Sequence, residues 1–178
     1  MKELNLAETF CEILSGLSLL FLLVPLLDLI GVFSLDKSIG LFTGNLTVAG
    51  LGALLLVSFF VGTAVVDAVG FAIEQLAGRY LPSDPVVTDA EKSVFWKTAS
   101  EHVLRYREHQ WTYYSCYRNL FIMLLPGGIC WAIVVWCRFG RGYAAMVFGA
   151  TALLEVALYF SMTGVLKLYH QITKYVGS

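Results

Sequence analysis

Four long apolar runs dominate the pattern of hydrophobic and polar positions along the chain. Each run holds at most one charged residue, and together they cover residues 13–33, 46–66, 119–137 and 142–166. A helix needs about 20 apolar residues to cross the roughly 30 Å hydrocarbon core of a bilayer. None of the runs alternates polar and apolar residues as the strands of a membrane barrel do. The pattern therefore predicts an all-α integral membrane protein with four transmembrane helices.

Composition supports this prediction and excludes other classes of protein. Of the 178 residues, 58% are hydrophobic and 14% are charged, whereas soluble domains carry about 25% charged residues. The net charge of −1 gives no basic field for a nucleic-acid partner. The first apolar run is also longer than the ~7–15-residue core of a signal peptide, so we expect it to be retained as a helix.

The distribution of lysine and arginine predicts the orientation in the membrane. Four crossings place both termini and the middle segment on one side, and that side carries nine of the twelve cations. The other three are Lys37, Arg138 and Arg141. Because cytoplasmic loops are enriched in Lys and Arg, we expect a multi-pass protein of the inner (plasma) membrane with its N- and C-termini in the cytoplasm.

The chain divides into three parts under this topology. Residues 1–66 hold transmembrane helices one and two, and residues 119–178 hold helices three and four with a short C-terminal tail. Residues 67–118 between them are the only sizeable segment outside the membrane. We predict that this segment is a cytoplasmic helical hairpin, and that any cytoplasmic partner protein or signal meets the chain there.

The expected hairpin is formed by extensions of helices two and three. Helix two shows no breaker between Leu46 and Tyr80, and Pro82 then ends it. Thr88 and Glu91 have the spacing of a capping box, which predicts the start of helix three.

A heptad seam follows this predicted start. Its positions alternate gaps of three and four residues, as in a helix packed on another helix. They are Trp96, Ala99, Val103, Tyr106, Gln110, Tyr113 and Tyr117. The seam faces either the extension of helix two within the chain or a neighbouring subunit, and the second alternative makes the protein a homo-oligomer in the lipid bilayer.

Two acids lie within the apolar runs. Glu155 is 14 residues from Arg141 and 12 from Lys167, which places it ~18–21 Å along a helix from either cation, near the membrane centre. Asp28 follows Pro25 in the first run. These acids either make hydrogen bonds between helices or line a water-filled path. Asp67 and Glu74, on a polar stripe of helix two, would continue such a path inward.

Helix three contains a predicted kink or hinge at Pro126, Gly127 and Gly128.

The sequence supports an enzyme less well than it supports a membrane pore or adaptor. His102 and His109 are seven residues apart and could share one helical face as metal ligands, but a solvated, charged face explains them more simply. We expect no catalytic residue, no bound metal and no cofactor.

The overall plan of the chain is defined by its length, its four apolar runs and its helical middle segment. An aromatic sequence, EHQWTYYSCYRNL, leads into helix three. In this plan the chain resembles the small multi-pass membrane effectors and accessory proteins of prokaryotic defence systems. The resemblance implies that a cytoplasmic cue triggers membrane permeabilisation.

A compact bundle of four helices has no aqueous lumen, so conduction requires an oligomer. We therefore expect an oligomeric membrane pore or ion-permeability effector gated through its cytoplasmic hairpin, with a role in anti-phage defence. The alternatives are a non-conducting membrane adaptor or structural subunit of a larger complex and, third, a membrane metal-dependent enzyme.

Overall fold

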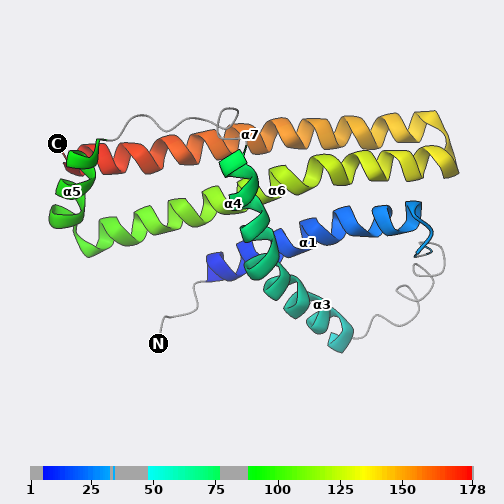
Figure 1. Cartoon of the computed structure of the whole chain (residues 1–178), viewed down its shortest axis with the longest axis horizontal. Coiled ribbons are helices and arrows are strands. Elements are labelled where there is room, and N and C mark those ends of the chain that lie inside the picture. Colours follow the sequence, from blue (N-terminus) through cyan, green and yellow to red (C-terminus); the bar gives the residue numbers. More distant parts are fainter. Residues whose placement is uncertain (1–5, 33, 35–47, 77–87, 178) are drawn as a thin grey trace.

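All regular secondary structure in the described part of the chain is helical. The computed structural model describes residues 6–32, 34, 48–76 and 88–177. The elements in chain order (Figure 1) are α1 (Leu6–Leu29), α3 (Val48–Val61), a π-helical turn η1 (Gly62–Val66), α4 (Asp67–Leu76), α5 (Asp89–Thr98), α6 (Glu101–Phe139) and α7 (Arg141–Gly177).

Four helical segments are long and apolar enough to cross a membrane, which confirms the four long apolar helices predicted from the runs. They are Glu8–Leu29, Gly52–Gly70, Glu101–Phe139 and Arg141–Val176. Only 19–28% of the most apolar stretch of each segment is buried within the chain. The remaining apolar surface faces outward, as expected for helices whose solvent is lipid.

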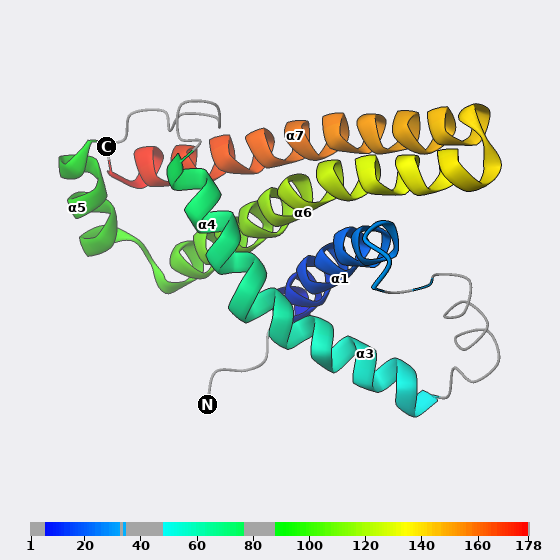
Figure 2. The same cartoon turned by 45° about the vertical axis from the view of Figure 1, so that its right-hand side comes forward.

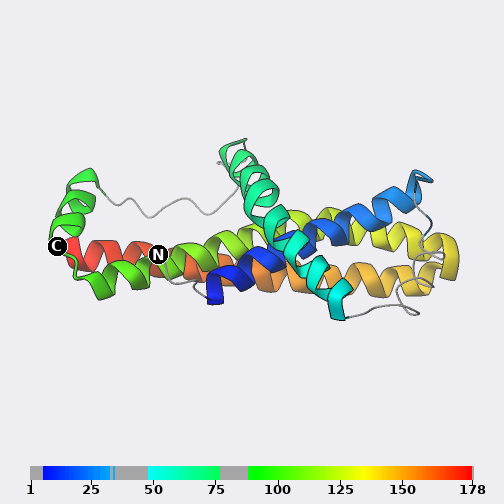
Figure 3. The ribbon, with the colours of Figure 1, turned by 90° about the horizontal axis from the view of Figure 1, so that it is seen from below.

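Helices α6 and α7 form a long antiparallel pair, side by side in every view (Figures 1–3). Gly140 connects them with φ of +93°, a left-handed conformation that glycine adopts without strain. Its N–H donates a hydrogen bond to the Trp136 carbonyl at 3.1 Å and so closes the end of α6. Facing pairs along the two helices are Gly128 with Thr151, Phe121 with Tyr159, and Trp111 with Tyr169.

Helix α1 lies along the other side of α6 and runs in the same direction (Figure 1). The indole N–H of Trp131 donates a 2.9 Å hydrogen bond to the backbone carbonyl of Phe21. Gly127 packs directly against Phe21 and Leu22, leaving no room for a Cβ. Small residues allow such close approach between membrane helices.

Helices α3 and α4 with η1 form one rod that crosses α1 and α6 steeply (Figure 3). The backbones of α1 and the rod meet where Gly16 contacts Ser58 and Gly62 contacts Glu12. A Cβ at either glycine would overlap the facing carbonyl. The helix expected from Leu46 to Tyr80 is confirmed from 48 to 76, and its two expected ends and Pro82 lie outside the described residues.

The expectation that helix three runs unbroken from the capping box is wrong. The capping box itself is confirmed, since the Glu91 N–H donates to the Thr88 hydroxyl and the Thr88 N–H donates to the Glu91 carboxylate. However, Ala99 and Ser100 are extended, with ψ of 130° and 156°. The break turns α5 aside and buries Phe95 completely, and this burial stabilises the turned position.

The segment expected as a short C-terminal tail is part of the fourth long helix, since α7 runs beyond the fourth apolar run. Helix α7 continues to Gly177, and its last turns pack against α5 and the first turns of α6 (Figure 2). The partner of the part of α6 that precedes the third apolar run is therefore mainly α7. Helix α4 contacts α6 over a shorter stretch, around Gly70.

Candidate functional site

Glu155 of α7 lies between α6 and α7 with 7% of its surface exposed. Neither carboxyl oxygen makes a hydrogen bond within the part of the chain that the structure describes. The backbone amide of Leu125 on α6 is beside the carboxyl but outside hydrogen-bonding geometry. An ionised acid at the centre of a membrane helix costs ~2.5–3.5 kcal/mol. Among the described residues of the four apolar runs, Glu155 is the acid that lacks a hydrogen bond.

The proline and glycines predicted as a hinge lie at the level of Glu155. Pro126 has no N–H, so the Ile122 carbonyl loses its usual donor within α6. Helix α6 nevertheless continues through Pro126 to Phe139. Gly127 packs on α1 and Gly128 packs on Thr151 of α7, which gives both glycines a packing role. Bending at this point stays a prediction.

Asp28 belongs to a different place and has a partner. The Arg138 guanidinium of α6 donates to both Asp28 oxygens, with Nη2 at 2.8 Å from Oδ1 and 2.7 Å from Oδ2. The Asp28 side chain is 9% exposed and that of Arg138 is 26% exposed. This ion pair joins the C-terminal ends of α1 and α6, whereas Glu155 faces Leu125, more than three helical turns earlier in α6.

A second buried polar group joins α1, α4 and α6. Arg118 and Asn119 are 3% and 1% exposed. The Asn119 Oδ1 accepts from Arg118 Nη2 at 3.1 Å, and its Nδ2 donates to the Ser15 hydroxyl at 3.4 Å. Gly70 of α4 lies against both α6 side chains. Asp67 and Glu74 are on the same helix, but their side chains lie outside the described part.

A polar cavity of about 140 Å³ adjoins Asn119 between the first turns of α1 and the middle of α6. The Cys116 thiol donates to the Cys11 carbonyl at 3.9 Å on one wall. Two carboxylates, two thiols and four hydroxyl or amide side chains contribute to the lining, which consists of Glu8, Cys11, Glu12, Ser15, Trp111, Thr112, Ser115, Cys116 and Asn119.

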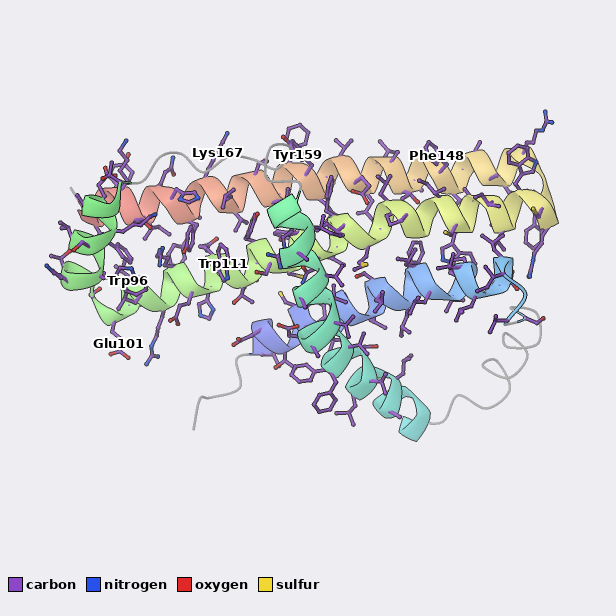
Figure 4. The ribbon with its side chains drawn as sticks, in the orientation of Figure 1. Trp96, Glu101, Trp111, Phe148, Tyr159 and Lys167 are labelled. Atoms are coloured by element: carbon purple, nitrogen blue, oxygen red, sulfur yellow. The ribbon has the colours of Figure 1, made fainter. Side chains whose placement is uncertain are left out.

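Arg107 joins α5, α6 and α7 at the far end of the long pair. Its guanidinium carbon lies 4.2 Å from the ring centre of Tyr169, 4.9 Å from that of Phe95 and 5.2 Å from that of Trp96. Its Nε donates to the Thr173 hydroxyl at 3.0 Å. Cation–π contacts contribute ~0.5–1 kcal/mol each at exposed sites. We call this cluster the Arg107 latch, and Figure 4 shows Trp96 at its edge beside the start of α6.

The predicted seam does not form one continuous face. Trp96 is on α5 and Ala99 is in the break, so the heptad register does not pass from them into α6. Within α6, Gln110 is buried, Val103 and Tyr117 are half-buried, and Tyr106 and Tyr113 are exposed. The apolar core of the pair is instead centred on Tyr114, Met162 and Leu166.

Sequence reasoning missed the Arg107 latch, the Arg118 and Asn119 pair, and Arg138 as the partner of Asp28. In the sequence, Arg107 and Arg118 were counted only among the nine cations of the predicted cytoplasmic side, and Arg138 among the three of the other side. The sequence did hold a signal for the Arg118 and Asn119 pair, because these two adjacent polar residues stand at the start of the third apolar run.

Within the described residues, no group of three or more His, Cys, Asp or Glu side chains is arranged to hold a metal ion. His102 is exposed and His109 is half-buried. Comparisons of the chain with protein-family models, with curated proteins and with solved structures found no match.

Proposed function

We propose that the protein is an oligomeric membrane pore or ion-permeability effector that is gated through its cytoplasmic helices. The observation that carries this proposal is Glu155, a buried carboxyl between the two longest helices whose oxygens make no hydrogen bond within the described residues. An acid that adds no visible bond to the fold but costs free energy in hydrocarbon is best explained by a function. Its position at mid-span suits an acid that meets permeating cations. The resemblance to effectors of prokaryotic defence systems suggests the setting.

Packing within one chain favours a path between subunits. Glycines allow α6 to pack closely against both α1 and α7. This close packing leaves no lumen along these described interfaces. Helix α3 touches α1 but leaves large apolar side chains exposed, including Leu56, Val57 and Phe60. Such a surface supports contact with neighbouring copies in the bilayer. In a symmetric ring, several Glu155 carboxylates would favour cations.

The Arg107 latch supplies a route from the cytoplasmic end to Glu155. Helices α6 and α7 have 39 and 37 residues, so each is ~55–60 Å long at 1.5 Å per residue. Both run without a break from the latch past Glu155 to the outer turn. A partner or signal that displaced α5 would therefore act on the two helices that enclose the acid. Separation of α6 from α7 at the level of Pro126 would then expose the Glu155 carboxyl to the proposed ion path between subunits.

Flux through reconstituted liposomes tests the proposal. Wild-type protein in vesicles with a K⁺ gradient should dissipate the gradient, and Glu155→Gln should slow this flux at least tenfold while it preserves side-chain shape. Glu101→Gln is the matched control, because Glu101 pairs with Arg105 on an exposed face and its loss should not affect flux. Tight wild-type vesicles containing a monomer would overturn the proposal.

A non-conducting adaptor is the second candidate, and two in-chain contacts favour it. The Asp28–Arg138 ion pair and the contact of Asn119 with Ser15 both hold helices together without any channel. An adaptor would show no flux in wild type or in Glu155→Gln. Its variants would change the amount of assembled complex in detergent instead.

A further inference from the structure

A shallow apolar groove of about 430 Å³ lies on the outside of the α6–α7 pair, next to the turn that connects the helices. Large side chains form its walls, with Ile133 and Trp136 from α6 and Phe148 from α7. Ala145 also lines the groove, and its methyl side chain leaves the space open. Arg141 stands at the end nearest the turn. Figure 4 shows Phe148 on this outer part of α7.

Aromatic residues place the end of the groove at a membrane surface. Trp136, Phe139 and Tyr143 are exposed around the turn, and aromatic belts mark the boundary between hydrocarbon and headgroups. From Trp136 the groove extends to Ile129, seven residues earlier in α6, which is ~10 Å at 1.5 Å per residue. It therefore lies within one leaflet, whose hydrocarbon is about 15 Å deep.

The charge at the end of the groove selects the kind of occupant. The Arg141 guanidinium carbon lies 5.6 Å from the centre of the Trp136 ring, at the level of the headgroups. The neighbouring cation, Arg138, is already bound to Asp28. A guanidinium binds a phosphate through paired hydrogen bonds, and the rest of the lining is apolar. We propose that the groove binds a glycerophospholipid, with one acyl chain along α6 and α7 and the phosphate on Arg141.

A second copy of the chain fits the groove less well than a lipid. Apolar surface alone does not drive association of helices in a bilayer, because lipid tails are equally apolar. A partner copy would need an acid opposite Arg141, and the acid described at this end of the chain, Asp28, is paired within its own subunit. A phospholipid supplies both the apolar chain and the anion.

Native mass spectrometry of the detergent-purified protein tests this site with dioleoylphosphatidylglycerol as the probe. Dioleoylglycerol, which lacks the phosphate, is the comparison ligand. Wild-type protein should retain one phospholipid per chain and prefer it to dioleoylglycerol. Arg141→Gln should reduce phospholipid occupancy about tenfold, in line with the loss of a charged hydrogen bond, and abolish the preference. Ala145→Leu should exclude both ligands, because it fills the groove from an exposed position.

Arg105→Gln is the control, because Arg105 is an exposed cation at the other end of α6. Equal lipid occupancy in all four proteins would overturn the proposal and show only non-specific annular lipid. A wild-type oligomer without bound phospholipid that Ala145→Leu dissociates would also overturn it, because the groove would then be a subunit interface. Neither readout depends on ion flux, so the lipid site and the proposed pore fail separately.

Discussion

Replacing Glu155 with leucine separates a functional role of this acid from a structural one. Leucine has a similar length and removes both buried oxygens, neither of which has a hydrogen-bond partner in the described structure. A buried polar group without a partner costs about 1–3 kcal/mol, and an ionised acid at mid-span costs ~2.5–3.5 kcal/mol. If Glu155 has no structural role, Glu155→Leu should stabilise the folded chain by roughly 1–3 kcal/mol and abolish ion flux.

The assay is reversible unfolding in mixed micelles, with helix content followed by circular dichroism against the mole fraction of dodecyl sulfate. Thr151→Val is a matched control one turn away, because the Thr151 hydroxyl donates to the Val147 carbonyl of its own helix at 2.9 Å. We expect the control to change the unfolding free energy by less than about 1 kcal/mol. A loss of 1 kcal/mol or more in Glu155→Leu would refute the reasoning, since the carboxyl would then contribute a contact that holds α6 and α7 together.

Two further predictions concern the ends of the helices. Asp28→Asn should lower the unfolding free energy by about 1–3 kcal/mol in the same micelle assay, between the values for surface and buried pairs, because Arg138 is partly exposed. The exchanged pair Asp28→Arg with Arg138→Asp should recover more than half of that loss, and no recovery would contradict the assigned contact. At the start of α5, hydrogen bonds from the Thr88 backbone and hydroxyl hold the pKa of the Glu91 carboxyl below its ordinary value. The stabilisation of this cap should be present above the ordinary glutamate range, near 4.3, and be lost as the pH falls through the lowered pKa. Hydrogen exchange in residues 89–98 should show this acid-induced loss relative to Glu91→Gln, and identical profiles would contradict it.

The four apolar helices could be predicted from the sequence because each carries its own signal. An uninterrupted apolar run is a property of consecutive residues, so it can be recognised without knowledge of any distant contact. The capping box of Thr88 and Glu91 is equally local, since both hydrogen bonds close within one turn. Such features depend on neighbours in the sequence, and the structure confirms them.

The pairing of the helices could not be predicted in the same way. The seam pattern showed that α6 has a packing face, but a pattern on one helix does not identify the helix that covers it. Residues after Lys167 have a mixed composition typical of a tail, yet they are helical because α6 extends far enough to pack against them. The break at Ala99 also depends on a distant contact, since Phe95 is buried only when α5 turns toward Arg107 and α7.

The two acids of the apolar runs now separate on physical grounds. Asp28 was grouped with Glu155 because both interrupt hydrocarbon, but Asp28 has a cation at 2.7 Å near a helix end, where an ion pair can hold helices together at little cost. Glu155 has no such partner in the described structure and lies ~20 Å along α7 from Arg141. The ion pair with Arg138 gives Asp28 a structural role. An acid without any role would be lost readily, because its removal should raise stability. We therefore propose for Glu155 a second state in which its carboxyl meets water, an ion or another subunit.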